Sequence, residues 1–300
     1  MSWINTLSDY QYYLKIERGL SENSILSYSN DIKKLINYIE VNDLKSTPIN
    51  IDDNAIQQFI YHSSKNISAR SQARLISGLR NFFDYLIFED YRQENPTDLL
   101  ESPKIGRKLP DTLSEEDIND IISQIDLSKP EGERNRAMFE ILYSCGLRVS
   151  EMIQLKISDL FFEEGFIRVI GKGNKQRFVP INAYSIKLID IYKNQIRSKI
   201  KIQKGFEDTL FLNRRGKQIS RNMVFMILKE LVQRSNVIKN VSPHTFRHSF
   251  ATHLLQNGAD LRAIQQMLGH ENITTTEIYV HLDRNYLKTV VERFHPRKDF

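Results

Sequence analysis

The chain has 300 residues, of which 40% are hydrophobic and 26% are charged, and its formal net charge is +5 at pH 7. This length suits two domains that each bury a core, and no apolar run approaches the roughly 18 residues that a membrane span needs. The N-terminal residues do not have the pattern of a secretory signal peptide, and Cys145, the single cysteine, cannot form an intrachain disulfide. We therefore expect a cytoplasmic protein without membrane insertion.

Charge is unevenly distributed along the chain. Residues 1–110 carry 13 Lys and Arg against 14 Asp and Glu, a balance of −1, whereas residues 111–300 carry 29 against 23, a balance of +6. A basic excess of this kind favours a polyanionic partner, although a solvated basic surface would leave the same composition.

Residues 1–103 are predicted to form a bundle of helices. Apolar residues recur at helical spacing over 25–39 and again over 75–86, and the connections between the periodic stretches are short and polar, as in small bundles. Residues 102–111 combine two Pro, one Gly and several basic residues. Few helices or strands tolerate that mixture, so we place a domain linker at 104–111.

Residues 112–300 are predicted to form a second domain, mostly helical with one small antiparallel sheet. The residues at 114–117 (SEED) resemble a capping box that opens a helix. Two runs of β-forming residues, 166–170 and 177–181, flank the turn-rich segment 171–175, which indicates a β-hairpin. The predicted fold class is therefore mainly α, with a small antiparallel β-sheet in the second domain.

The segment 242–248 (SPHTFRH) is the most informative motif. Ser242 before Pro243 suits a helix N-cap followed by the first helical residue, which puts His244 in the first turn and Arg247 on the same face. A helix N-terminus favours phosphate, and both side chains could add charge-assisted hydrogen bonds. An ordinary capped helix with a surface arginine is the alternative interpretation.

Two further cations stand at turns. Arg148 follows Gly146 at the end of a predicted helix, where a second guanidinium would complete a clamp on one phosphate, because guanidinium is planar and permanently charged. Lys172 lies between Gly171 and Gly173 at the predicted hairpin tip, where it could deliver a proton to a leaving oxygen. A surface arginine and a solvated turn lysine are the alternatives.

Tyr279 is the candidate nucleophile. Residues 274–277 (TTTE) resemble a capping box, which places Tyr279 early in the helix that follows, with His270 a little before it. A tyrosine hydroxyl with an ordinary pKa of about 10 attacks phosphorus only beside cations or a base. The alternative is a tyrosine that packs in the core.

A metal site is the weaker interpretation of the histidines. His244 and His248 are four residues apart on a predicted helix, a spacing that zinc sites use, but no nearby Cys or acidic residue completes a ligand set. We therefore predict no metal and no cofactor.

Together these motifs resemble the tyrosine recombinase (phage integrase) family, and within it the bacterial Xer branch that resolves chromosome dimers. The matching segments are CGLRVSE at 145–151, GKGNK at 171–175, HTFRHSFATH at 244–253, LGH at 268–270 and IYVH at 278–281. Each motif is weak alone, whereas the ordered set, along nearly the whole chain, is specific. The resemblance implies a SAM-like core-binding domain over 1–103 and a catalytic domain over 112–300.

The resemblance implies that six matching residues are catalytic: Arg148, Lys172, His244, Arg247, His270 and Tyr279. The two arginines would hold the scissile phosphate, the lysine would protonate the departing 5′ oxygen, and the two histidines would assist proton transfer. The tyrosine would become a 3′-phosphotyrosine. That bond conserves the phosphodiester energy, so resealing needs no ATP, and the cations stabilise the developing charge without a metal.

Four further residues are expected to bind DNA. Arg70 and Arg74 share one face of a helix that begins near Ser68, and Lys175 and Arg177 flank the predicted hairpin tip. A solvated basic face is the alternative for the first pair, and the near-neutral charge of residues 1–110 suggests a modest or local contribution.

The expected function is site-specific recombination at a double-stranded DNA site, converting chromosome dimers to monomers at cell division. The resemblance implies a tetramer with a second Xer-type recombinase on two DNA sites, and activation by a septal DNA translocase. Four alternatives stay open: an integrase of a mobile element, a DNA-binding relative without strand exchange, a relaxing topoisomerase and a metal nuclease.

A stripe of apolar residues near the C-terminus is expected to dock into a neighbouring protomer rather than onto its own chain. The stripe, at helical spacing, consists of Leu287, Val290, Val291 and Phe294.

Overall fold

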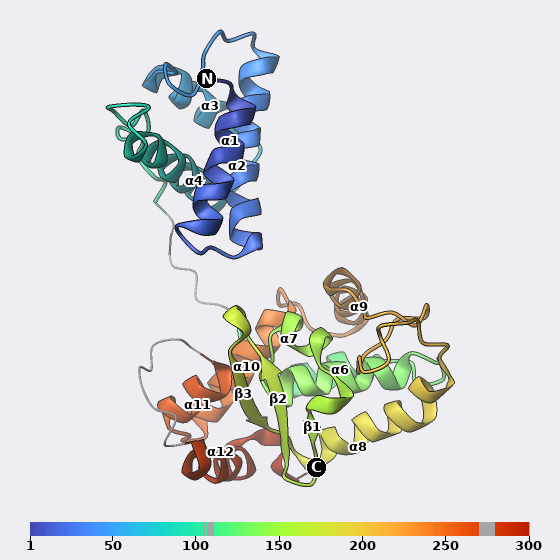
Figure 1. Ribbon diagram of the computed structural model, residues 1–300. Helices are drawn as coiled ribbons and strands as arrows, with labels where there is room; N and C mark the ends of the chain where they lie inside the picture. Colours follow the sequence, from blue (N-terminus) through green and yellow to red (C-terminus); the bar gives the residue numbers. More distant parts are fainter. Residues whose placement is uncertain (105, 107–110, 270–279, 300) are drawn as a thin grey trace. The chain divides into compact units, whose positions relative to one another are not determined.

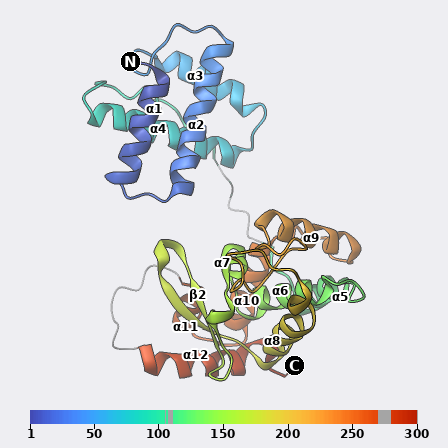
Figure 2. The same cartoon turned by 45° about the vertical axis from the view of Figure 1, so that its right-hand side comes forward.

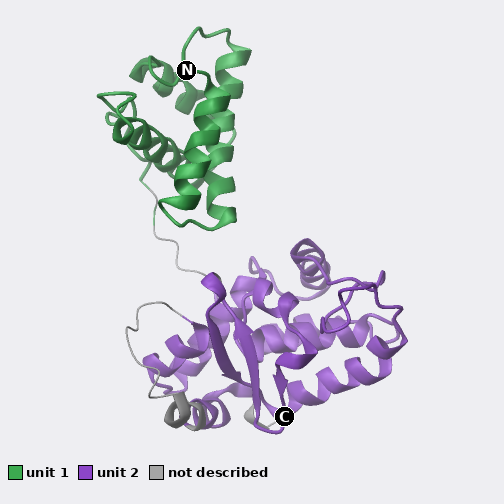
Figure 3. Cartoon of the chain, viewed as in Figure 1, with its two compact units in different colours: residues 1–108 green, residues 109–300 purple. Residues whose placement is uncertain are grey.

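A computed structural model describes residues 1–104, 106, 111–269 and 280–299, and for Lys172, 280–285, 298 and 299 it describes the backbone alone (Figure 1). The chain divides into unit 1, residues 1–108, and unit 2, residues 109–300 (Figure 3). Each unit has its own hydrophobic core. The predicted fold class, mainly α with a small antiparallel sheet, is confirmed. Within the described ranges, no helix combines the length and the apolar character that a membrane span requires.

Unit 1 is a bundle of four helices. Each helix follows a Ser or Asp whose side chain accepts a hydrogen bond from the backbone N–H three residues on, which satisfies one of the free donors of the first turn. The helices are α1 (Trp3–Ile16), α2 (Glu22–Val41), α3 (Asp53–Ser64) and α4 (Ala69–Phe88). The apolar residues at helical spacing over 75–86 form the buried face of α4, with Leu75, Leu79 and Phe82 in the core.

An ion pair with a fully buried carboxylate joins α2 to α4. The Asp31 carboxylate accepts Arg74 Nη1 at 2.7 Å and Nη2 at 2.6 Å, and Nη1 also donates to Ser27 Oγ at 2.8 Å. One turn later, a Cβ at Gly78 would lie 2.6 Å from Asp31 Oδ2, so the glycine permits this close approach. Arg74, expected to bind DNA, is thus partly engaged within the bundle, although 48% of its side chain is exposed.

We expect Gly78→Ala to destabilise unit 1 by about 1–3 kcal/mol, because the new methyl group would collide with Asp31. By helix propensity alone, alanine is more favourable than glycine by about 1 kcal/mol. A decrease in the free energy of unfolding would therefore indicate the packing effect, and an increase would indicate helix propensity. Urea unfolding measures it, with Ser77→Ala on the exposed face of α4 as the control. A Gly78→Ala protein as stable as this control would contradict the packing argument.

Unit 2 is built around α6, which is buried along most of its length and contacts α5, α7, α8 and α10. The helices are α5 (Glu115–Ser123), α6 (Gly132–Ser144), α7 (Val149–Gln154), α8 (Ala183–Ile191), α9 (Arg221–Arg234), α10 (Pro243–Gln256), α11 (Leu261–Leu268) and α12 (Val280–Phe294). Short 3-10 or π turns are η1 (Ile157–Asp159), η2 (Lys172–Asn174), η3 (Tyr192–Ile196), η4 (Arg197–Lys199) and η6 (Pro296–Asp299). The predicted capping box of α5, between Ser114 and Asp117, is confirmed.

The sheet has three antiparallel strands in the order β1-β2-β3. They are β1 (Leu160–Phe161), β2 (Phe166–Ile170) and β3 (Gln176–Pro180). The predicted hairpin is therefore confirmed, with its second strand one residue earlier than expected and an additional short strand, β1. Gly173 and Asn174 turn the chain at φ 70° and 60°, and α11 and α12 pack against β3 (Figure 2).

The apolar stripe on α12 packs on its own chain, which was the alternative to the expected docking into a neighbouring protomer. Leu287, Val290 and Val291 are buried in the core of unit 2, and Phe294 packs against that core. The helix contacts β3, α10 and α11. Burial within one chain avoids the loss of translational and rotational freedom that association brings, which favours this arrangement.

The residues after α12 are held by buried polar groups of α6. Arg297 Nε donates to Glu140 Oε1 at 3.0 Å, and both side chains are buried. The His295 ring contacts that of Tyr143, and His295 Nδ1 accepts the Arg297 backbone N–H at 3.0 Å. These contacts attach the end of the chain to the centre of unit 2.

Acid should destabilise unit 2 through His295. Burial first, and then the charge of Arg297, lower the His295 pKa to about 3, whereas an unfolded histidine titrates near 6.5. The unfolded state therefore binds more protons between pH 6.5 and 3, and stability falls as pH falls through that window, by at most about 1.4 kcal/mol per pH unit.

The test is His295→Asn, which keeps an acceptor for the Arg297 N–H. Unfolding midpoints in urea at pH 8 and pH 5 should differ less in this variant than in the wild type. Burial also lowers the His253 pKa, but that contribution is common to both proteins. The control is His62→Asn, which makes the same substitution at an exposed histidine of α3. An equal loss of stability between pH 8 and 5 in His295→Asn and the wild type would refute the argument.

Candidate active site

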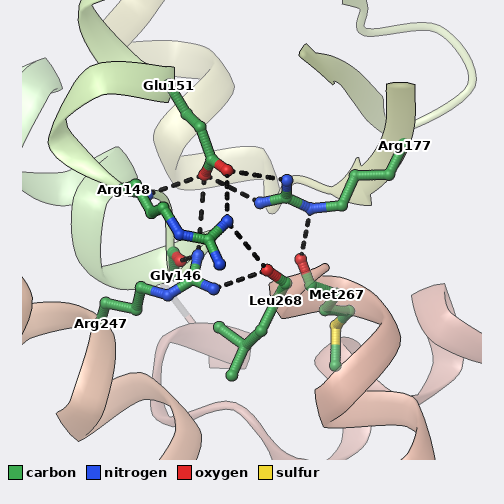
Figure 4. Close-up of polar contacts among 7 residues, drawn as sticks. All are labelled: Gly146, Arg148, Glu151, Arg177, Arg247, Met267 and Leu268. Carbon is green, nitrogen blue, oxygen red and sulfur yellow. Dashed lines mark hydrogen bonds and ion pairs between the residues drawn. The ribbon is translucent and has the colours of Figure 1, made fainter. Parts of the chain in front are cut away.

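Three arginines converge on one buried carboxylate in unit 2 (Figure 4). Glu151 lies in α7, and its side chain is only 3% exposed. It accepts Arg148 Nη1 at 2.7 Å and both terminal nitrogens of Arg177 at 2.9 Å, while Arg247 Nη1 lies 3.6 Å away. We call Arg148, Arg177, Arg247 and Glu151 the arginine cluster.

The turn between α6 and α7 positions Arg148. Gly146 adopts φ 58°, and a Cβ there would lie 2.4 Å from Cδ1 of the Phe250 ring, so both conformation and packing require glycine. Arg148 then caps α7, and its backbone N–H donates to Glu151 Oε2 at 2.8 Å. The carboxylate thus fixes the backbone and the guanidinium of the same residue.

The structure brings Arg148 and Arg247 together, as the clamp hypothesis requires. Arg247 lies in α10 and donates to the Gly146 carbonyl at 2.8 Å, across 101 residues of sequence. Its Nη2 donates to the Leu268 carbonyl at 2.5 Å, and Arg148 Nη1 reaches the same oxygen at 3.4 Å. Arg247 is almost buried, whereas 34% of the Arg148 side chain is exposed and can meet a ligand.

The arginine cluster carries a net charge of +2, because three guanidinium groups surround one carboxylate. Burial alone would raise the Glu151 pKa, but hydrogen bonds and charge from Arg177, together with Arg148, outweigh burial and lower it. Burial and the neighbouring charge of Arg148 lower the Arg247 pKa to about 10, which leaves Arg247 protonated at neutral pH. A partly buried site with this charge suits a phosphodiester.

Glu151 and Arg177 are the residues of this site whose roles the sequence did not reveal. Glu151 stands in the CGLRVSE motif, three residues after the helix cap, and a Glu at that position commonly bonds back to the cap. Arg177 was expected to bind DNA, but three of its N–H donors go to Glu151 and to the Met267 carbonyl, and only 14% of its side chain is exposed. The structure thus places it inside the arginine cluster.

Other predicted residues lie on elements around the cluster. The N-cap Ser242 and first residue Pro243 of α10 are confirmed, and His244 follows them on the exposed side of the first turn. Lys172 follows Gly171, whose Cβ position would lie 3.9 Å from Glu151 Oε1, so the start of the hairpin loop lies beside the cluster.

Two predicted residues, His270 and Tyr279, lie outside the described residues. Gly269 ends α11 in the left-handed conformation, directly before His270. Lys175 is exposed beside the hairpin tip, and Arg70 is exposed on α4 in unit 1. Among the described residues, no three or more His, Cys, Asp or Glu side chains are grouped to hold a metal ion.

Cys145, the only thiol in the sequence, is a poor alternative nucleophile. It is completely buried, Sγ lies 3.5 Å from the Pro180 carbonyl, and burial raises the thiol pKa to about 12. Cysteine chemistry depends on an accessible thiolate, which this position does not provide.

Known families and structures match both units. Residues 111–285 match the phage integrase family, and residues 7–90 match its N-terminal SAM-like domain. The chain is 41% identical to Tyrosine recombinase XerD of Staphylococcus saprophyticus, over 97% of this chain and 98% of that protein. It is 40% identical to Tyrosine recombinase XerD of Listeria innocua over the same shares. The crystal structure of the XerH site-specific recombinase bound to its difH substrate matches with a TM-score of 0.70 at 25% identity, over 92% of this chain and 82% of that one.

The chain therefore belongs to the phage integrase family, the tyrosine recombinases, which are site-specific DNA recombinase enzymes. The resemblance based on the ordered motifs is confirmed.

Proposed function

We propose that this enzyme cuts and rejoins a double-stranded recombination site through Tyr279 and converts chromosome dimers to monomers at cell division. The observation that carries the proposal is the pairing of Arg148 and Arg247 at one carbonyl, within a cluster of net positive charge. Two guanidinium groups from distant parts of the chain then hold one scissile phosphate.

The chemistry follows from that grip. The Tyr279 oxygen attacks phosphorus, a tyrosyl O–P bond forms, and the bond from phosphorus to the 5′ oxygen breaks. One of the two histidines, His244 or His270, accepts the phenolic proton that Tyr279 loses, and both bind phosphate oxygens. Lys172 supplies the proton that the 5′ oxygen takes up. Negative charge grows on the phosphate as the new bond forms, and the arginines stabilise it in place. Attack by a 5′ hydroxyl of another strand reverses the step and joins the exchanged strands.

Binding of DNA is assigned to both parts of the chain. Residues 1–103 act as the core-binding domain, 104–111 as the linker, and 112–300 as the catalytic domain. Arg70 and the exposed part of Arg74 contact DNA from α4, and Lys175 contacts it beside the hairpin tip. Contacts of this kind position the enzyme on the phosphate backbone and weaken as salt increases.

The partners are proposed from the relatives. The related XerH structure contains a difH substrate, and relatives with 40–41% identity are named XerD. We extend this to a tetramer in which the chain acts with a second Xer-type recombinase on two DNA sites in the cytoplasm. A septal DNA translocase activates the assembly.

Trapping the covalent intermediate tests the function. A suicide duplex is nicked close to the cleavage position, so that cleavage releases a short fragment carrying the 5′ hydroxyl. Loss of that fragment prevents resealing. With a chelator present, the protein should become linked to DNA, and peptide mapping should find the link at Tyr279. A link at another residue, or cleavage that needs a metal and leaves no link, would refute the proposal. Cleavage that relaxes DNA without pairing two sites would indicate a topoisomerase.

A further inference from the structure

Arg177 lies on a strand of the hairpin, and its side chain points toward Glu151 of the arginine cluster. It lies on β3 opposite Val169 of β2, and Nη1 and Nη2 each donate to a different oxygen of Glu151 at 2.9 Å. Figure 4 shows Arg148 and Arg247 together on one side of this carboxylate and Arg177 on another. The bidentate geometry is the strongest pairing that a guanidinium makes with a carboxylate.

The Arg177 pairing decides what Arg148 and Arg247 are free to bind. Glu151 is buried and charged, so it needs neighbouring positive charge and donors. With Arg177 in place, each Glu151 oxygen accepts two hydrogen bonds, from Arg177 and from Arg148. The net charge of +2 is then available to a phosphate. Without Arg177 it would fall to +1, and the other two arginines would be drawn toward the carboxylate.

Arg177 also holds the end of α11. Its Nε donates to the Met267 carbonyl at 2.8 Å, and a Cβ at Gly269 would lie 3.1 Å from Nη1. The last carbonyls of a helix carry partial negative charge, which cations stabilise. Arg177 therefore contacts the end of α11 directly before His270 in the sequence. The same guanidinium is next to Gly171, where the hairpin loop that carries Lys172 begins.

We propose that Arg177 is a positioning residue of the recombination reaction: it neutralises Glu151 and holds the end of α11, so that Arg148 and Arg247 keep their charge for the scissile phosphate. It touches no substrate itself. The role of Arg177 in the reaction rests on the proposed function, whereas the neutralisation of Glu151 by Arg177 is a property of folded unit 2.

The first test measures covalent capture in a single turnover at saturating suicide duplex, for Arg177→Gln and Arg177→Lys. A displaced clamp should slow capture by about 100-fold in Arg177→Gln, and less in Arg177→Lys, which keeps the charge but loses the fork. DNA affinity should change little. Lys187→Gln, which removes one exposed charge from α8, is the matched control and should retain wild-type capture.

The double variant Arg177→Gln with Glu151→Gln separates charge positioning from a loss of folding. If Arg177 acts by neutralising Glu151, removing that carboxylate should restore capture. The double variant should capture DNA at least about tenfold faster than Arg177→Gln. All rates are compared at a temperature where circular dichroism shows every variant folded. Capture by Arg177→Gln at the Lys187→Gln rate, or a double variant no faster than Arg177→Gln, would overturn the inference.

Binding of inorganic sulfate tests the inference without the covalent chemistry. Sulfate should raise the Tm of the wild type by binding the folded cluster, and raise that of Arg177→Gln less. If the wild type fails to capture DNA, the proposed function fails, while the sulfate comparison still decides the role of Arg177. An equal rise of Tm in both proteins would count against that role.

Discussion

Replacing Tyr279 by Phe is expected to abolish the covalent protein–DNA complex while DNA binding persists. The change removes one phenolic oxygen and keeps the ring. Loss of a nucleophile lowers enzymatic rates by factors on the order of 10⁶, which puts residual capture below detection. Denaturing gels with a labelled suicide duplex measure capture, and gel shifts measure binding.

The matched control for this change is Tyr286→Phe, at an exposed tyrosine of α12. It should capture DNA at the wild-type rate. If Tyr279→Phe still became linked to DNA, another residue would be the nucleophile. If both variants lost capture together with DNA binding, the tyrosines would be acting through the stability of unit 2 rather than through chemistry.

The second large effect is expected for Arg247→Lys. Lysine retains one positive charge but not the planar fork that reaches the Gly146 and Leu268 carbonyls while facing a phosphate. Loss of one preorganised donor typically costs about 10²–10³ in rate, so single-turnover capture should fall by that factor. Losing hydrogen bonds to buried carbonyls should also lower the free energy of unfolding by about 1–3 kcal/mol.

Arg136→Lys is the control for Arg247→Lys, since the Arg136 guanidinium donates to the Tyr184 hydroxyl rather than within the arginine cluster. It should reduce stability slightly and leave capture unchanged. Rates measured below the melting temperature of both variants separate chemistry from folding. If Arg247→Lys captured DNA as fast as Arg136→Lys, the clamp of two guanidinium groups would not be the source of the rate.

The sequence determined the local architecture of this protein. The capping box at Ser114, the Ser242–Pro243 start of α10 and the hairpin around Gly173 are each encoded within a few residues. The helical periodicity of α4 likewise identified its buried face correctly. Signals of this range are readable because a cap, a turn or an amphipathic face depends on neighbours within about four residues.

Tertiary structure decided how the charges pair and which faces are covered. The sequence predicted that Arg74 and Arg177 bind DNA. In the structure Arg74 pairs with Asp31, 43 residues away, and Arg177 pairs with Glu151, 26 residues away. The sequence predicted that the apolar stripe on α12 contacts a neighbouring protomer, whereas in the structure it is covered by the core of its own unit. A basic or apolar side chain has the same local pattern whether it meets solvent, a partner or its own chain. Only the packing of distant elements brings a carboxylate within 3 Å of a guanidinium and so fixes what that guanidinium is free to bind.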